Sequence, residues 1–241
     1  MVKKENEKMD FSKYKYHIEC HAHTKPVSRC SEIEPKRLVD VYNLIGYDTV
    51  VITNHFDPYW LGFSKKDAVK KYLEGYEQTR DYAQKTTKMK IILGMEIRFT
   101  ENVNDYMVYG IDEEFVEKCY DYLDGTIEKF YKSMKNDKNV ILQAHPFRNN
   151  MVLADKRYID GIEAFNMHPG QNSRVSFACK YLKENKDMLT CGGTDYHHEG
   201  HEGSISLVSE FLPENSFDIA KIIKSRDFIF DIHGNKIEVR T

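Results

Sequence analysis

The stretch Glu19-Cys20-His21-Ala22-His23 ends the first expected strand of the chain, which begins at residue 16. Side chains two positions apart on a strand point to the same face, so His21, His23 and Glu19 share one face. Two imidazoles aimed the same way at the carboxyl end of a strand make half of a metal site. The alternative is a pair of incidental polar residues where the strand ends.

Two later stretches repeat this pattern. Asp195 and His197 follow the expected strand 188–191 and a pair of glycines, and His145 follows the apolar run 140–142. The carboxyl ends of strands are where barrel enzymes hold their ligands. The alternatives are an Asx-turn with a surface histidine for the first pair, and a satisfied core histidine for His145. Imidazoles and carboxylates delivered by distant strand ends are typical of a multi-metal hydrolytic site.

Glu96 lies within the apolar run 93–97. A carboxylate in such a run is costly to bury unless it is paired or bound to a metal. We therefore consider two roles, a bridging metal ligand and a buried pair with Arg98, which points to the same face.

Three more residues are placed by the strands around them. His55 directly follows the expected strand 49–53, and Asp105 begins the run that leads into the strand 106–109. His168 follows another strand, and we interpret it as a residue of the substrate pocket or of the surroundings of the metal ligands.

Basic residues near these strand ends could bind an anion. Arg148 comes three residues after His145, so it must lie near the metals if His145 is a ligand. Arg29, in the loop after His23, is a second candidate for substrate binding. Lys25 and Arg174 lie in similar loops, where such side chains are more often solvated surface charges.

The composition argues against several classes of protein. The 241 residues carry a formal net charge of −3, which argues against a general affinity for nucleic-acid backbone. No apolar run approaches the ~18–20 residues that a membrane span requires, and no signal peptide is visible. Five cysteines without CxxC spacing suggest no disulfide framework, so we expect a reduced, cytoplasmic protein. Cys20 and Cys191 are expected to pack in the core.

Short β-branched runs alternate with longer amphipathic runs along the chain. The expected strands are residues 16–20, 49–53, 90–97, 106–109, 140–143, 161–165, 188–191, 205–208 and 228–230. The expected helices are residues 34–45, 65–85, 113–135 and 173–184. This order predicts an α/β fold with a parallel sheet, closed or nearly closed into a barrel. We expect one domain over residues 1–241, in which residues 204–241 complete the barrel.

Five segments resemble, in family order, the motifs of the PHP (polymerase and histidinol phosphatase) superfamily of metal-dependent phosphoesterases. They are His21-Ala22-His23, Thr53-Asn54-His55, Gly94-Met95-Glu96, Ala144-His145-Pro146 and Gly193-Thr194-Asp195-Tyr196-His197. The likeness extends over residues 16–197. It implies a distorted (β/α)7 TIM-like barrel, with core motifs within about residues 16–200 and two or three divalent ions (Mn, Fe or Zn) at the strands' carboxyl ends.

The resemblance also implies how the ligands are shared. One ion would be held by His21, His23, Glu96 and Asp195. A second would be held by the bridging Glu96, His145 and Asp105, and a third by His55 and His197.

Three departures from the family pattern concern the site. Many members carry histidine where Asp105 stands, and a carboxylate shifts preference toward Mn²⁺ or Fe²⁺ over Zn²⁺. Asn54 replaces the usual aspartate. The loop 26–31 offers no histidine for a third metal, so that position is weak, empty or completed by another group.

The resemblance implies hydrolysis of a small phosphomonoester, nucleotide-like or histidinol-phosphate-like, by a metal-bound hydroxide. Arg148 would orient the phosphate oxygens, Asp195 would hold metal, and His197 would assist the leaving alkoxide. The expected partner is therefore a small phosphorylated substrate. The alternatives are an amidohydrolase-type metal hydrolase and a non-catalytic PHP metal-binding domain.

Overall fold

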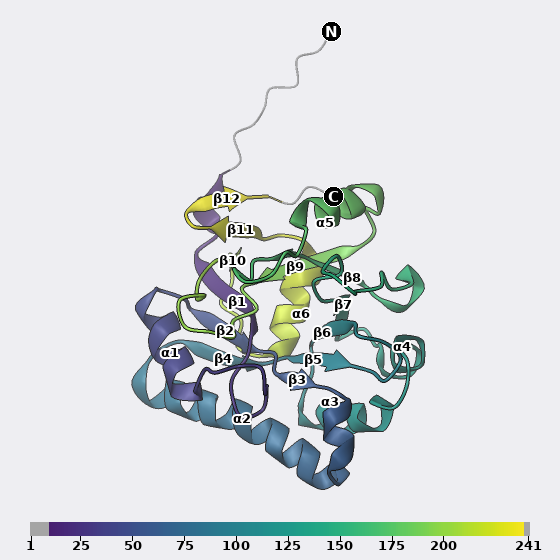
Figure 1. Ribbon diagram of the computed structural model, residues 1–241. Helices are drawn as coiled ribbons and strands as arrows, with labels where there is room; N and C mark the ends of the chain where they lie inside the picture. Colours follow the sequence, from purple (N-terminus) through teal and green to yellow (C-terminus); the bar gives the residue numbers. More distant parts are fainter. Residues whose placement is uncertain (1–9, 239–241) are drawn as a thin grey trace.

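The computed structural model describes residues 10–238, in which strands and helices alternate over most of the chain (Figure 1). The strands form two six-stranded sheets. The order of the first sheet is β12 (Asn235–Ile237), β11 (Ile229–Ile232), β10 (Ser206–Ser209), β1 (Tyr16–Ala22), β2 (Thr49–Ile52) and β4 (Lys90–Leu93). The order of the second is β3 (His55–Phe56), β5 (Met95–Arg98), β6 (Asp105–Tyr109), β7 (Val140–Gln143), β8 (Gly161–Asn166) and β9 (Leu189–Gly193).

Two stretches of chain pass from the first sheet into the second. β2 continues into β3 after two residues, and β4 continues into β5 after Gly94 alone. A Cβ atom at Gly94 would lie 2.7 Å from a methyl group of Val51, so only glycine allows this close approach. Because β3 and β5 are parallel, with His55 opposite Glu96, this passage places the two side chains next to each other.

The other ends of the two sheets also meet. β1 contacts β9, and Ala22 forms an isolated parallel bridge with Tyr196. Tyr109 lies in the core between them, where its hydroxyl donates to the carbonyl of Cys20 at 2.9 Å and lies 3.8 Å from Cys191 Sγ. Both cysteines are fully buried there, as expected from the sequence.

The expectation of a parallel sheet is confirmed for some strand pairs and wrong for others. β5 and β6 pair in antiparallel fashion, because only residues 99–104 join them and a parallel crossover needs a dozen or more. β6 also pairs in antiparallel fashion with β7, although residues 110–139 join these two strands. β10, β11 and β12 also pair in antiparallel fashion and extend the first sheet beyond β1. The fold is therefore mixed α/β.

The helices are α1 (Pro35–Leu44), α2 (Lys65–Thr86), α3 (Glu113–Cys119), α4 (Ile127–Met134), α5 (Val175–Glu184) and α6 (Ser216–Ser225). The single helix expected over 113–135 is wrong. The chain leaves α3 through a 3₁₀ turn and starts α4 afresh after Gly125, where the Thr126 side chain accepts from the backbone N–H of Lys129.

α6 covers the end of the sheets that lies away from the expected ligands. Its Ser216 hydroxyl accepts from the backbone N–H groups of Gly110 and Ile111, just after β6 ends. Asp105 begins that same strand and therefore lies at the opposite end. Within residues 10–238, no helix has the length and apolar character needed to cross a membrane.

Candidate metal centre

All eight predicted metal ligands lie together at one end of the strands. Three overlapping groups have ligand atoms within 4.8 Å of one another: His21, His23 and Glu96; His55, Glu96 and Asp105; and His23, His55 and His197. His145 and Asp195 join them through the contacts described next.

Glu96, from β5, lies at the centre of the cluster. Its Oε1 is 3.1 Å from His145 Nε2 and 3.4 Å from His21 Nε2. Its Oε2 is 2.9 Å from His55 Nδ1 and 3.3 Å from His23 Nε2. Each carboxylate oxygen therefore faces two imidazoles, which is the geometry that a bridging ligand requires.

Asp195, which follows β9, faces the same imidazoles from the other side. Its Oδ1 lies 3.4 Å from His21 Nε2, 3.3 Å from His23 Nε2 and 3.2 Å from His197 Nδ1. Its Oδ2 accepts from Arg148 at 2.6 Å. His21 and His23 thus stand between two carboxylates.

Asp105 is held by Arg98, so the pair considered for Glu96 forms with Asp105 instead. Arg98 Nε and Nη2 donate to the two carboxylate oxygens at 2.8 and 2.7 Å. Oδ2 of Asp105 remains 3.9 Å from His145 Nε2. Burial and the charge of Glu96 raise the pKa of Asp105, and Arg98 opposes this shift.

The cluster contains buried polar atoms that fit a metal. His21 Nε2, His23 Nε2 and Glu96 Oε2 have no partner in hydrogen-bonding geometry among residues 10–238. Nitrogen and oxygen atoms of neighbouring ligands lie near these three atoms, but not in the directions that a hydrogen bond requires. Buried polar atoms without partners are costly, and a divalent ion would satisfy them together.

The surroundings of His21 fix which ring nitrogen faces the cluster. Its Nδ1 donates to Glu163 Oε1 at 2.8 Å, so Nε2 is directed at Glu96 and Asp195. Glu163 Oε2 also accepts from the backbone N–H of His145 at 3.0 Å. Glu163 was not among the predicted site residues, although its position inside the apolar run of β8 is a signal of the same kind as that of Glu96.

A second network fixes His23. The amide oxygen of Asn54 accepts from the backbone N–H of Thr24 at 2.7 Å and from the Ser28 hydroxyl at 2.9 Å. Because Ser28 has given its only proton to Asn54, it accepts from His23 Nδ1 at 2.9 Å. His23 Nε2 therefore carries a lone pair. Asn54, which is uncharged, thus positions His23 through Ser28, a role that the amino-acid sequence alone did not indicate.

The charges in the cluster favour a cation. Burial lowers the pKa of His21, but the carboxylates of Glu163, Asp195 and Glu96 raise it well above its usual value. Burial raises the pKa of Glu96, but the surrounding histidines hold it well below its usual range. A proton on His21 therefore occupies a position that a metal ion could take.

Cys30 was not among the predicted site residues, but it faces the histidines. Its Sγ lies 3.1 Å from His197 Nε2. Partial burial raises the pKa of this thiol, but hydrogen bonds to His197 and His55 outweigh that effect and lower the pKa to about 6. Cys30 belongs to the loop 26–31, which contains no histidine, and its thiol faces the cluster from there.

Glu19 shares the strand with His21 but has a different role. Its carboxylate accepts from the backbone N–H groups of His21 and Thr194 and from the Tyr42 hydroxyl. Burial raises the pKa of Glu19 to about 7 in spite of these bonds. Gly193 makes room for it, because a Cβ there would lie 2.4 Å from His21 Cβ and 2.9 Å from Glu19 Oε1.

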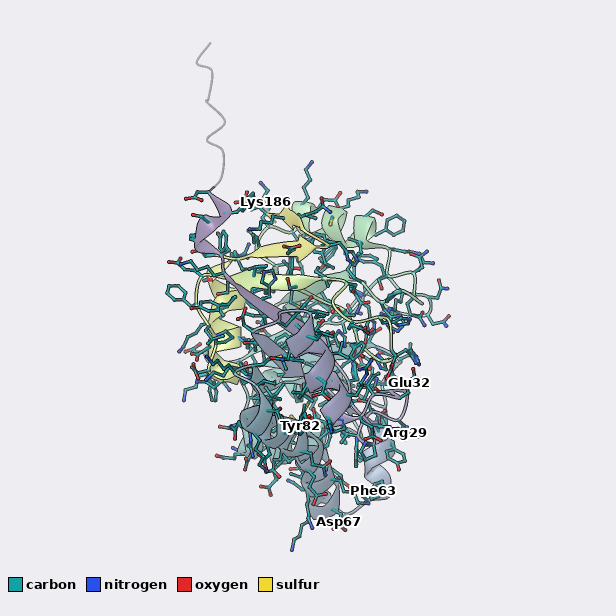
Figure 2. The ribbon with its side chains drawn as sticks, turned by 90° about the vertical axis from the view of Figure 1, so that its left-hand side faces the viewer. Arg29, Glu32, Phe63, Asp67, Tyr82 and Lys186 are labelled. Atoms are coloured by element: carbon teal, nitrogen blue, oxygen red, sulfur yellow. The ribbon has the colours of Figure 1, made fainter. Side chains whose placement is uncertain are left out.

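A cavity of about 420 Å³ opens above the cluster. Arg98, Arg148 and His168 line it, together with most of the ligands. Burial lowers the pKa of His168 to about 4. Arg29 lies instead at an adjoining cavity of about 380 Å³, where its guanidinium stacks on Tyr59 with 3.8 Å to the ring centroid. Arg29 is labelled in Figure 2, on the right-hand side of that view.

Two of the ligands have unusual backbone conformations. His145 has φ 30° and Asp195 has φ 57°, both in the left-handed region that residues other than glycine rarely adopt. Each residue lies just after the end of a strand, β7 for His145 and β9 for Asp195. The turn at each position directs the side chain toward the cluster.

Comparison with known proteins identifies a shared fold. No family model and no curated protein sequence matches the chain. The structure is similar to that of PsfC from Pseudomonas syringae (TM-score 0.62, 18% identity, covering 90% of this chain and 91% of that one). It is also similar to a candidate metal-dependent phosphoesterase from Bifidobacterium adolescentis (0.54, 15%, 87% and 96%). A third match is an amidohydrolase from Chromobacterium violaceum with bound sulfate and no metal (0.53, 12%, 77% and 89%). The chain therefore shares the fold of these three structures and carries a buried histidine and carboxylate cluster suited to metal ions.

Proposed function

We propose that the protein is a metal-dependent phosphoesterase that hydrolyses a small phosphomonoester. The observation that carries the proposal is the convergence of unpartnered, buried ligand atoms beside Arg148 in a cavity of about 420 Å³. We further propose that the two sheets together form one domain with a distorted (β/α)7 barrel. The passages from β2 to β3 and from β4 to β5, and the contact of β1 with β9, support that arrangement.

His21, His23, Glu96 and Asp195 would hold one divalent ion, and Glu96, His145 and Asp105 a second. Such ions supply water activation near neutral pH and neutralise phosphate charge. Arg148 would orient the phosphate, because its guanidinium is fixed by Asp195, Asn166 and Ser173 at the cavity wall. His197 would stabilise the leaving alkoxide, through its own proton or as the ligand of a further ion.

The adjoining cavity supports a substrate with a flat leaving group. Tyr59, Trp60 and Arg29 line it, and it shares Cys30, His55 and Arg98 with the main cavity. Stacked aromatic and guanidinium groups suit one base or ring. This favours a nucleotide-like over a histidinol-phosphate-like substrate, and the limited volume argues against a long nucleic acid.

An amidohydrolase-type activity is the second candidate, favoured by the similarity to the Chromobacterium violaceum structure. The experiment is a hydrolysis screen of protein reloaded with Mn²⁺, Fe²⁺ or Zn²⁺, against phosphomonoesters, amides and lactones. We expect turnover of a phosphomonoester, and its loss in Asp195→Ala. Full phosphatase turnover by Asp195→Ala in metal-defined buffer would refute the proposal. Turnover of amides or lactones alone would favour the second candidate.

A further inference from the structure

Cys30 lies beside a group of three histidines, His23, His55 and His197, and contacts the last of them. Its Sγ is 3.1 Å from His197 Nε2. The ring centroid of His23 lies 4.1 Å from that of His197 and 4.5 Å from that of His55. Cys30 lines both cavities, so its sulfur stands where they join.

The nitrogen that faces the sulfur is ready to bind a cation. His197 Nδ1 lies 2.9 Å from the backbone carbonyl of Asp195, which can only accept, so the ring proton belongs to Nδ1. Nε2 then faces Cys30 Sγ with a single proton between the two atoms. A cation that replaces this proton would contact both atoms.

A second observation points to a ligand at the same place. His23 Nε2 is fully buried and without a hydrogen-bond partner in the described residues, and its lone pair is fixed by Ser28. Ligand atoms of His23, His55 and His197 lie within 4.8 Å of one another. His23 Nε2 also faces Glu96 and Asp195, so it stands between the first metal position and this one.

We propose that Cys30 is a thiolate ligand of a third divalent ion, which it holds together with His55 and His197. Binding releases to solvent the proton that lies between Cys30 Sγ and His197 Nε2. Zinc–sulfur and zinc–nitrogen bonds of about 2.3 and 2.0 Å place the two ligand atoms about 3.5 Å apart in a tetrahedral site. The observed 3.1 Å needs only a small shift of an exposed side chain.

The sulfur gives this position a different metal preference from its neighbours. Thiolate and imidazole ligands favour zinc, whereas carboxylates favour manganese. The position around Glu96 and Asp105 is rich in carboxylate, and the position around Cys30 has none in its proposed set. The protein would therefore hold ions of different kinds within one cluster.

The experiment uses cobalt as the probe, because a thiolate bound to Co²⁺ gives a charge-transfer absorption in the near ultraviolet. Purified full-length protein is stripped, reloaded with Co²⁺, and measured by absorption and by metal counting. We expect the band in the native protein and its loss in Cys30→Ser, with about one bound ion fewer. Cys30→His should restore the ion without the band. Cys179→Ser changes another exposed thiol, on α5, and should keep both.

A band that survives in Cys30→Ser, or a native protein that binds three ions without the band, would overturn the proposal. Melting temperatures of the variants test folding separately, and Cys30→His provides a second substitution if Cys30→Ser is unstable. The proposal rests on the metal centre of the proposed function, but no readout uses a substrate. Failure of the phosphatase screen and failure of the cobalt test are therefore distinguishable.

Discussion

His21 donates from Nδ1 to Oε1 of Glu163 over 2.8 Å, and both side chains are fully buried. This pair sets the direction of the imidazole before any metal binds. Glu163 also binds the backbone of His145, so one carboxylate positions ligands from two strands.

Replacing Glu163 by glutamine should weaken metal binding. The amide keeps the shape and one acceptor but loses the charge that polarises His21. Partners of metal ligands typically contribute 10–100-fold in affinity, and we expect a loss of about that size. Competition with a chromogenic chelator measures it. Glu184→Gln, on the exposed face of α5, is the control, and equal affinities for both variants would contradict the role of Glu163.

Gly193→Ala should destabilise the protein and lower its metal content. Its Cβ would lie 2.8 Å from the backbone nitrogen of His21, which has no flexible end that could move away. Overpacking of this kind costs about 1–3 kcal/mol. Urea unfolding and metal counting provide the measurement. At Gly62 nothing lies within 4 Å of an added Cβ, so Gly62→Ala should change neither quantity. Similar behaviour of the two variants would show that the close contact is not required.

Arg148→Lys should impair phosphomonoester hydrolysis. Lysine keeps the charge but cannot bind Asp195 and substrate oxygens with one planar group. A hydrogen bond to a charged group contributes about 1.5–3 kcal/mol, so kcat/KM should fall about 10- to 150-fold. Steady-state kinetics at saturating metal measure it. Arg157→Lys changes an exposed arginine and is expected to leave the kinetics unchanged. An unaltered kcat/KM in Arg148→Lys would exclude the proposed phosphate contact.

Metal removal should lower the melting temperature. Ions that bind only the folded chain stabilise it by about 2.7 kcal/mol when present at about 100 times their Kd. For a chain of this length, that corresponds to about 5–11 °C. Differential scanning of chelator-treated and reloaded protein measures the difference. In Glu96→Gln the difference should shrink, because the bridging carboxylate is lost. A melting temperature that does not respond to metal in the native protein would indicate that the cluster is not a metal centre.

The strands and the candidate ligands could be predicted because each depends on a local pattern. Apolar runs mark β1, β2, β4 and β7, and a polar residue directly after such a run is conspicuous. Strand ends in one layer meet at one edge, and the resemblance to the PHP superfamily motifs implied that eight ligands from distant segments share one site. The structure brings all eight together.

Other features depend on contacts that no local pattern contains. The antiparallel pairing of β6 with β5 follows from a short connection, but the same apolar run would suit a parallel strand. Cys30 sits in a loop whose path is set by Ser28 and Asn54, so only the folded chain shows that it faces His197. Arg98 could have paired with either carboxylate, and the register of β5 with β6, which places it opposite Asp105, decides between them.

The left-handed backbone of His145 and Asp195 affects which substitutions a selection for stability would favour. Such conformations cost of order 1–3 kcal/mol each, and glycine adopts them without that cost. At these two positions of the cluster, the same backbone would therefore be more stable with glycine than with His145 or Asp195. A library of variants selected only for heat resistance, in the presence of a chelator, should become enriched in glycine at these two positions. The selected variants would be more stable but would lack two of the metal ligands.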